Sequence, residues 1–280
     1  MSIRVQVLSS VVVVVVGLIP AGAGAGCAEP YYDDNIGVEG VPTQEGSLAG
    51  TFAIESLATD QADVPIFGRI DTGGVTYALI TRTWREEEPS TYDETIKVCD
   101  VLNFETAGLT TVNTPDTIAG IPEATTTLTV EHATGAFVRT PFREFWAVRD
   151  LDNDDDFPTD IDSPVFYDMD DDNNPGTTVV ASGLQSGEVY VAQRKTVDHQ
   201  GVVRSADNSF GLAKVKKEGI VLDASNDLLK TESPRTPHPD PKRSWWFEIR
   251  LDDDDDCGAV MAAVADETLP LRSPIPSPQE

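Results

Sequence analysis

Apolar and polar residues alternate with a period of two along most of the chain, which is the pattern of half-buried β-strands. The clearest case lies near the C-terminus, where Trp245, Phe247, Ile249 and Leu251 share one face of a single segment. β-Branched and aromatic residues, which favour strands, are frequent in the same segments. Ordered structure is expected to begin near 51–54. The strands predicted after it cover 75–84, 95–102, 125–131, 137–140, 145–149, 177–181, 188–197, 202–205, 211–216, 219–223 and 244–251.

Short turns rich in Gly, Asp and Asn separate these segments, including 198–201 and 218–219, and only 259–265 has the character of a helix. Many short strands joined by short turns predict an all-β domain built as an antiparallel meander. Closure of the meander into an up-and-down, lipocalin/calycin-like barrel of about eight strands would remove its exposed edges. A β-sandwich is the alternative.

The N-terminal part of the chain has the composition of an export signal. One positive charge in 1–4 precedes an apolar stretch at 5–20, and small residues follow up to Cys27. Segments rich in Gly, Pro and acidic residues flank the predicted strands on both sides. The predicted organisation is a signal peptide at 1–26, a flexible tether at 27–49, a single β domain at 50–265 and a disordered Pro-rich tail at 266–280.

Two cleavage sites are compatible with this leader. Ala23-Gly24-Ala25 fits an A-x-A site, whereas Ala25-Gly26-Cys27 resembles the end of a bacterial lipobox with Gly24 in place of the usual Leu. Lipidation of Cys27 would leave Cys99 and Cys257 as an even pair for a disulfide in an oxidising compartment. We therefore expect a Cys99–Cys257 bridge and a lipid anchor at Cys27. The anchor would place the protein in the cell envelope, on the outer membrane or facing the periplasm.

The formal net charge of −28 at pH 7 restricts the partners of this protein. A chain with this charge repels nucleic acid, so nucleic-acid binding is excluded as a function, and it favours divalent cations. Eleven aspartates and no lysine or arginine lie between 150 and 172. Such crowding must be relieved by a bound cation, by exposure to solvent or by raised pKa values.

The stretch FYDMDDDNNPG spaces three aspartates so that they can turn toward one ion. Asp168, Asp170 and Asp172 fill the first, third and fifth positions of a calcium-loop pattern, and Asn173 at the sixth tolerates the left-handed backbone that closes such a turn. The twelfth position is Val179, so the bidentate glutamate of an EF-hand is missing.

A neighbouring stretch repeats the spacing with more carboxylates. Asp152, Asp154 and Asp156 occupy the first, third and fifth positions, Asp160 occupies the ninth, and Phe157 stands at the sixth, where a positive φ is unfavourable. The two stretches together supply the predicted Ca²⁺ ligands. The alternative is that both are solvated acidic loops.

The sequence contains no established catalytic motif. It has no G-x-S-x-G, no H-E-x-x-H and no glycine-rich phosphate loop, and the three histidines, His132, His199 and His238, are scattered. Each histidine is expected to be exposed, and no catalytic residue is predicted. A non-enzymatic role in the cell envelope, structural or interacting and stabilised by calcium, is the favoured hypothesis over a secreted hydrolase.

A carrier of a small apolar ligand is the second hypothesis, since a β-barrel can hold a molecule at its mouth. A pocket lined by aromatic residues would favour the carrier, and a filled interior would favour the structural role. The aromatic candidates are Tyr77, Trp84, Trp146, Trp245 and Trp246.

The leader, the acidic segment after Cys27 and the D-x-D-x-D-x-x-P-G turn at 168–176 together resemble the uncharacterised lipoproteins common in myxobacteria-like bacteria. The resemblance implies a lipid-anchored protein of the cell envelope. It implies no catalytic activity.

Overall fold

The computed structural model describes residues 39–64, 68–152, 155–230 and 235–269, and β-strands account for most of them. The first half of the chain forms β1 (Gly50–Val64), β2 (Gly68–Trp84), β3 (Thr91–Asn103), β4 (Leu109–Asn113), α1 (Pro115–Gly120), β5 (Ala124–Glu131), β6 (Ala136–Arg139) and β7 (Phe142–Trp146). The second half forms β8 (Thr177–Gly183), β9 (Gly187–Ser205), β10 (Asn208–Ala224), η1 (Asp227–Leu229), β11 (Arg235–Pro237), η2 (Pro241–Arg243), β12 (Trp245–Arg250) and α2 (Cys257–Ala265).

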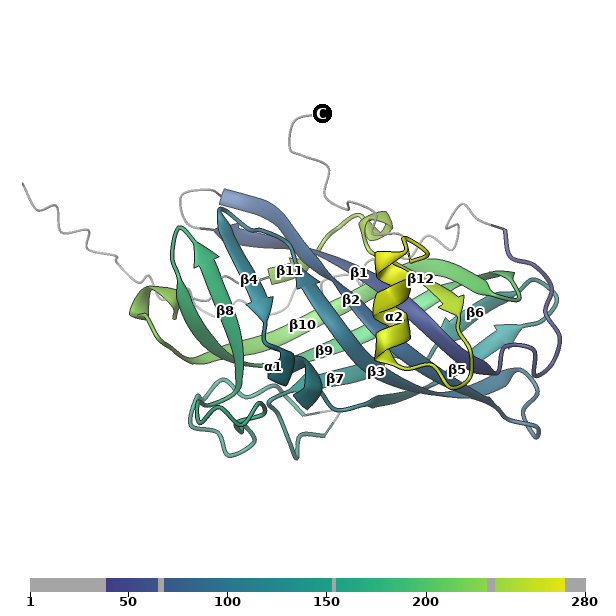
Figure 1. Cartoon of the computed structure of the whole chain (residues 1–280), viewed down its shortest axis with the longest axis horizontal. Coiled ribbons are helices and arrows are strands. Elements are labelled where there is room, and N and C mark those ends of the chain that lie inside the picture. The colour runs from purple at the N-terminus through teal and green to yellow at the C-terminus, as the bar shows by residue number, and fades with distance from the viewer. Residues whose placement is uncertain (1–38, 65–67, 153–154, 231–234, 270–280) are drawn as a thin grey trace, which may run out of the picture. The chain divides into compact units, whose positions relative to one another are not determined.

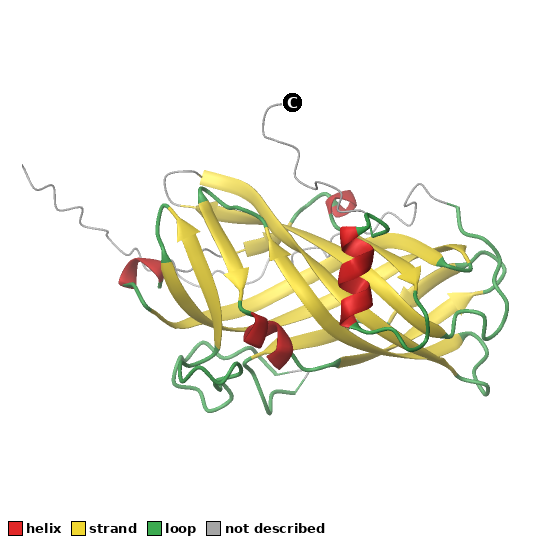
Figure 2. Cartoon of the chain, viewed as in Figure 1, coloured by secondary structure: helices red, strands yellow, loops and turns green. Residues whose placement is uncertain are grey.

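Eight of the strands close into a ring in which every neighbouring pair is antiparallel. In ring order the strands are β1, β2, β3, β5, β6, β9, β10 and β12, and β12 pairs with β1 again. This order is also the order along the chain, so the ring is a meander (Figures 1 and 2). The predicted antiparallel all-β fold is confirmed. A sandwich would need two sheets, whereas one sheet contains the twelve strands described.

The ring departs from a regular barrel because four strands branch from it. The edge of β9 that faces away from β10 pairs in turn with β8, β7 and β6. β3 pairs with β5 over one part of its length and with β4 near its end, and β4 pairs with β8. A short β11 adds to β1. Strands β4 and β8 therefore extend the wall beyond β5 and β6 at one end of the ring.

Two predicted turns are wrong, because 198–201 lies inside β9 and 218–219 lies inside β10. The glycine that suggested the first turn, Gly201, pairs with Gly211 across the two strands. A Cβ atom on Gly201 would lie 2.5 Å from Cζ2 of Trp246. Glycine is needed there because backbones and an indole ring approach closely, and not because the chain turns.

The interior at one end of the ring is a packed apolar core. One cluster of buried residues draws on all eight ring strands; its members include Phe52, Ile80, Tyr92, Leu128, Phe137, Val203, Ala213 and Trp246. Burial of this surface from eight strands is the main force that closes the ring.

Helix α2, where the sequence predicts the only helix, covers the outer face of β1 and β2. Its Val260 packs with Leu57 and Tyr77 in a separate apolar cluster. The predicted Cys99–Cys257 disulfide is confirmed and ties the first turn of α2 to β3 across 158 residues of sequence. A bridge closing so long a loop stabilises the fold by about 5 kcal/mol in the chain-entropy model. The short α1 was not predicted, although Thr114 caps it.

The described segments next to the ring contact it. Val41 N donates to Val203 O at 2.9 Å, and Leu48 is buried in the core cluster. After α2, Leu269 is buried and its N donates to Ala263 O. The predicted signal peptide, Cys27 and residues 270–280 lie outside the described residues.

Candidate ligand cavity and acidic metal site

A cavity of about 920 Å³ adjoins the apolar core inside the ring. It extends to the β3–β4 and β8–β9 turns, which lie together at the left of Figure 1. Cavities of 300 to about 1,000 Å³ accommodate most small-molecule ligands. The strands supply its wall through their inward positions: on β8, Val179 and Ala181 line it, whereas Val180 between them is exposed.

The wall of the cavity is largely apolar. It includes Ile54, Ala78, Phe142, Trp146, Val191 and Val215. At the mouth, Leu184 and Leu228 are 76% and 66% exposed, which is unusual for leucine. An apolar wall with an apolar rim suits a ligand that has a hydrocarbon part.

Four charged side chains form a row at the cavity, and three of them, Glu144, Lys195 and Lys217, line it. Glu144 of β7 stands opposite Lys195 of β9, and Lys195 stands opposite Lys217 of β10. Lys217 Nζ lies 2.6 Å from Oδ2 of Asp60 on β1, and Lys195 Nζ lies 3.2 Å from Oε2 of Glu144. The signs along the row are therefore minus, plus, plus and minus. Lys195 Nζ also lies 4.3 Å from the ring centroid of Trp146.

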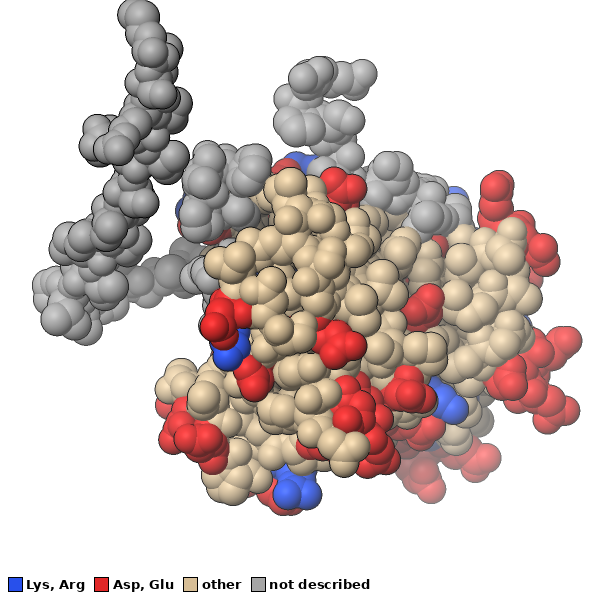
Figure 3. Space-filling model, turned by 60° about the vertical axis from the view of Figure 1, so that its left-hand side comes forward, with Lys and Arg blue, Asp and Glu red and all other residues tan. Residues whose placement is uncertain are grey.

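The environment of Lys217 disfavours its charged form. Burial lowers the pKa of its ammonium, Asp60 raises it in part, and the positive charges of Arg235 and Lys195 lower it further. The three cations lie close enough to repel one another in a protein whose net charge is −28. The surface of the protein is acidic by contrast, and on the face shown in Figure 3 Asp and Glu predominate over Lys and Arg.

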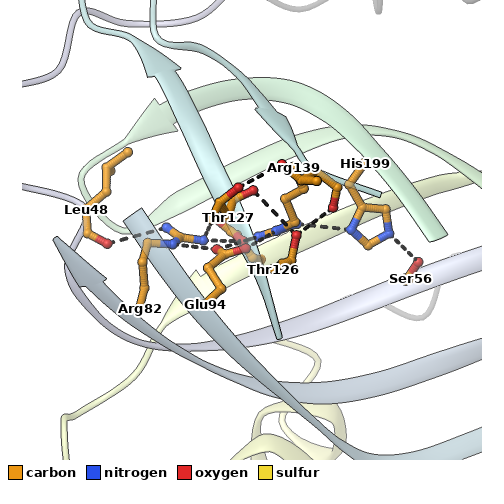
Figure 4. A network of polar contacts seen from close by, with 10 residues as sticks. Leu48, Ser56, Arg82, Glu94, Thr126, Thr127, Arg139 and His199 are labelled. Carbon is orange, nitrogen blue, oxygen red and sulfur yellow. Dashed lines mark hydrogen bonds and ion pairs between the residues drawn. The ribbon is translucent and has the colours of Figure 1, made fainter. Parts of the chain in front are cut away.

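His199 lies at the inner end of the cavity, buried, so its predicted exposure is wrong. Its Nδ1 lies 3.1 Å from Nη1 of Arg139, and its Nε2 lies 3.1 Å from Oγ of Ser56 (Figure 4). A guanidinium can only donate, so Nδ1 accepts and the imidazole proton is on Nε2. Burial and the positive charge of Arg139 hold the pKa of His199 well below its usual range. The imidazole is neutral and donates to Ser56, whereas a catalytic base would accept from the serine.

Beyond His199, four fully buried charges form a closed network (Figure 4). Arg82 Nε and Arg139 Nε each lie 2.7 Å from a carboxylate oxygen of Glu94, and both guanidinium groups donate to Glu248. Burial raises the pKa of Glu248, but the two arginines outweigh it and hold that pKa below its usual value. Two positive and two negative charges balance, which is the condition for burying ions without a large loss of stability.

The aspartates of FYDMDDDNNPG are brought together as predicted. One carboxylate oxygen each from Asp168, Asp170 and Asp172 lies within 4.8 Å of the others, so this group could hold a metal ion. Asn173 has φ of 67°, the left-handed conformation expected at the sixth position. Asp168 accepts from the backbone N of Asn173 at 2.9 Å, which fixes the turn around the carboxylates.

Asp170 has an oxygen that the protein does not satisfy. The side chain is 9% exposed. Its Oδ2 accepts from Thr178 N at 2.8 Å and from Thr117 Oγ1 at 2.9 Å, but Oδ1 has no hydrogen-bond partner among the described residues. A buried carboxylate oxygen without a donor is costly, and a cation would remove that cost. This atom points to a ligand independently of the aspartate spacing.

The neighbouring acidic stretch has a different structure. Asp152, Asp156 and Asp160 are exposed and form no such group in the described part of the chain, and Asp154 lies outside it. Phe157, at the sixth position, packs against Phe166 with ring centroids 5.9 Å apart. The aromatic ring anchors this stretch to the apolar cluster beneath it.

The aromatic candidates are divided between the cavity and the core. Trp146 lines the cavity. Trp84 and Trp246 pack in the core cluster inside the ring, and Tyr77 and Trp245 pack in the cluster beneath α2. Sequence reasoning missed the charged row, because period-two patterning places Glu144, Lys195 and Lys217 on inward faces of their strands but does not give the register that sets them opposite one another.

No protein-family model, curated protein or solved structure matches this chain. Among the described residues, the helices are too short or too polar to cross a lipid bilayer.

Proposed function

We propose that this protein is a non-enzymatic carrier of the cell envelope that binds a small, largely apolar molecule inside its β ring. The supporting observation is the cavity of about 920 Å³ with an apolar wall, Trp146 in that wall and exposed leucines at its mouth. A filled interior would have favoured a purely structural role.

The arrangement of Ser56 and His199 favours binding over catalysis. These two residues are the pair at the cavity that most resembles a nucleophile and its base. Arg139 keeps the imidazole proton on Nε2, so the histidine cannot accept the serine proton without losing the Arg139 contact. In a carrier, Ser56 and His199 would provide a polar, uncharged surface at the inner end of the cavity.

We also propose that Asp168, Asp170 and Asp172 bind Ca²⁺ and that the ion has a structural role. Three carboxylates suit a hard cation, and backbone carbonyls or water would complete its six to eight ligands. Asp170 is hydrogen-bonded to α1 through Thr117 and to β8 through Thr178. The ion would therefore stabilise the contact of the acidic loop with a strand that lines the cavity.

The disulfide between Cys99 and Cys257 is typical of extracytoplasmic proteins. Together with the sequence of the leader, it supports export. Lipidation at Cys27 would then hold the carrier at a membrane surface, where apolar molecules are available.

The carrier function is tested by binding of a neutral apolar fluorophore, N-phenyl-1-naphthylamine, to the purified full chain. Ala181 faces the cavity and the adjacent Val180 faces outward, so Ala181→Trp should reduce probe binding about ten-fold or more by occupying cavity volume. Val180→Trp is the matched control and should bind the probe like the wild type. Equal binding by both variants would show that the probe does not enter the cavity.

A further inference from the structure

We infer that the ligand is an amphiphile with a carboxylate head group, and that Lys195 and Lys217 bind this carboxylate. The inference rests on the proposed carrier function and specifies its ligand. The apolar wall favours a hydrocarbon tail, and the two lysines favour a negatively charged group at one position along the cavity.

Lys195 and Lys217 are directly opposite each other on β9 and β10, and both line the cavity. Like charges directly opposite on neighbouring strands destabilise a sheet. Their carboxylate partners, Glu144 and Asp60, lie on the outer flanks of the pair, so neither stands between the lysines. An anion bound in the cavity beside both lysines would reduce their mutual repulsion.

Both lysines have N–H donors available for a ligand. Each ammonium has three N–H groups. Lys217 directs one N–H to Asp60 at 2.6 Å, and Lys195 forms an ion pair with Glu144 Oε2 at 3.2 Å without a hydrogen bond to that atom. Both ammonium groups therefore keep N–H donors for a ligand. A carboxylate has two oxygens and can accept one charge-assisted hydrogen bond from each lysine.

The row of charges crosses the cavity between two apolar regions. Apolar residues line the space on both sides of it, with Val197 and Val215 toward His199 and with Val191 and Ala181 toward the mouth. A head group at the row leaves the hydrocarbon tail in apolar surroundings. A ligand charged along its whole length would not fit this pattern.

A competition experiment on the purified full chain tests the inference. Dodecanoate and 1-dodecanol have the same tail and differ in the charge of the head group, and each is titrated below its aggregation limit against bound N-phenyl-1-naphthylamine. Two charge-assisted hydrogen bonds should make dodecanoate bind at least about ten-fold more tightly than dodecanol. Equal affinities, or tighter binding of dodecanol, would overturn the inference.

A charge-balanced variant identifies the lysine responsible. Lys217→Gln alone would leave Asp60 buried without its partner, so the variant is Asp60→Asn with Lys217→Gln. It should weaken dodecanoate binding about ten-fold and leave dodecanol binding unchanged. Lys216→Gln is the matched control, because Lys216 is the neighbour on β10 and is exposed. Dodecanoate binding to the double variant as tight as to the wild type would exclude Lys217.

The carrier function and the carboxylate assignment would be refuted by different results. If the neutral probe does not bind at all, the carrier function is wrong, and its ligand assignment falls with it. If the probe binds and dodecanoate shows no advantage over dodecanol, the cavity carries a neutral ligand and only the head-group assignment is wrong.

Discussion

Replacement of Arg139 by methionine should be among the most destabilising single changes in the ring. Arg139 is fully buried and donates to Glu94, to Glu248 and to the ring nitrogen of His199. Methionine preserves much of the volume of the side chain but removes its charge. Glu94 and Glu248 would then share Arg82 alone, so one uncompensated negative charge would remain buried.

The expected magnitude follows from burial. Removing one partner of a buried ion pair costs about 3–5 kcal/mol. Arg85 provides a matched control, because it also pairs with two carboxylates, those of Asp93 and Glu88, but at the surface. Arg85→Met should cost less than about 1 kcal/mol. The two variants therefore separate the effect of burial from the effect of losing an arginine.

The assay is urea unfolding with the disulfide intact, followed by tryptophan fluorescence, with the free energy of unfolding extrapolated to water. The guanidinium carbon of Arg139 lies 5.0 Å from the Trp246 ring, so the probe is close to the change. Adding Glu94→Gln to Arg139→Met should recover part of the loss, because it restores equal numbers of charges. A loss of stability no greater than that of Arg85→Met would refute the argument that this network is balanced and closed to water.

Two further predictions concern the acidic loop and the buried histidine. Millimolar Ca²⁺ should raise the melting temperature of the wild type more than Mg²⁺ does, and Asp170→Asn should abolish this difference between the two ions. The control Asp171→Asn should retain the difference, since Asp171 lies outside the ligand group. A Ca²⁺-specific rise that persists in Asp170→Asn would place the ion elsewhere. Because the folded-state pKa of His199 lies well below its usual range, protonation of the unfolded chain lowers stability as the pH falls through about 6.5. The wild type should lose up to about 1.4 kcal/mol more per pH unit below 6.5 than His199→Gln; equal slopes would contradict a neutral buried imidazole.

Local alternation was sufficient to predict the antiparallel strands and a closed arrangement, because each ring strand pairs with the next ring strand along the chain, although β4, β7, β8 and β11 intervene. It was insufficient to predict strand length. β9 has 19 residues and passes through Asp198–Gly201, whose polar residues and glycine resemble a turn. The turn signal failed because His199 is buried against Arg139 and Gly201 against Trp246. Both contacts come from strands distant in sequence.

The chemistry of the site was predictable to a similar, limited extent. The spacing of Asp168, Asp170 and Asp172 correctly indicated convergent carboxylates. At the second acidic stretch, the described residues Asp152 and Asp156 are exposed and Phe157 packs against Phe166, and Asp154 lies outside the described residues. Periodicity assigns a residue to a face of a strand, but it does not identify which residues of other strands lie opposite. The charged row across β7, β9, β10 and β1 depends on that register, so it became visible only in the structure.

The two ends of the ring interior differ in how they are filled. At one end, large apolar side chains and two balanced pairs of ions fill the space. Toward the other end, small inward residues such as Ala58, Ala62 and Ala181 leave space, and two neighbouring lysines face it.

Protein interiors are normally packed to high density, so an unfilled cavity does not stabilise the fold. Two lysines opposite each other on neighbouring strands also repel each other and destabilise the sheet. His199 and Ser56 lie at the boundary and close the cavity with neutral hydrogen-bonding groups. Charge-changing substitutions in the ion network should therefore act mainly on unfolding, whereas the charge-balanced replacement of Lys217 together with Asp60 should act mainly on ligand affinity. Such a separation would allow the proposed carrier to keep its fold when the cavity is empty.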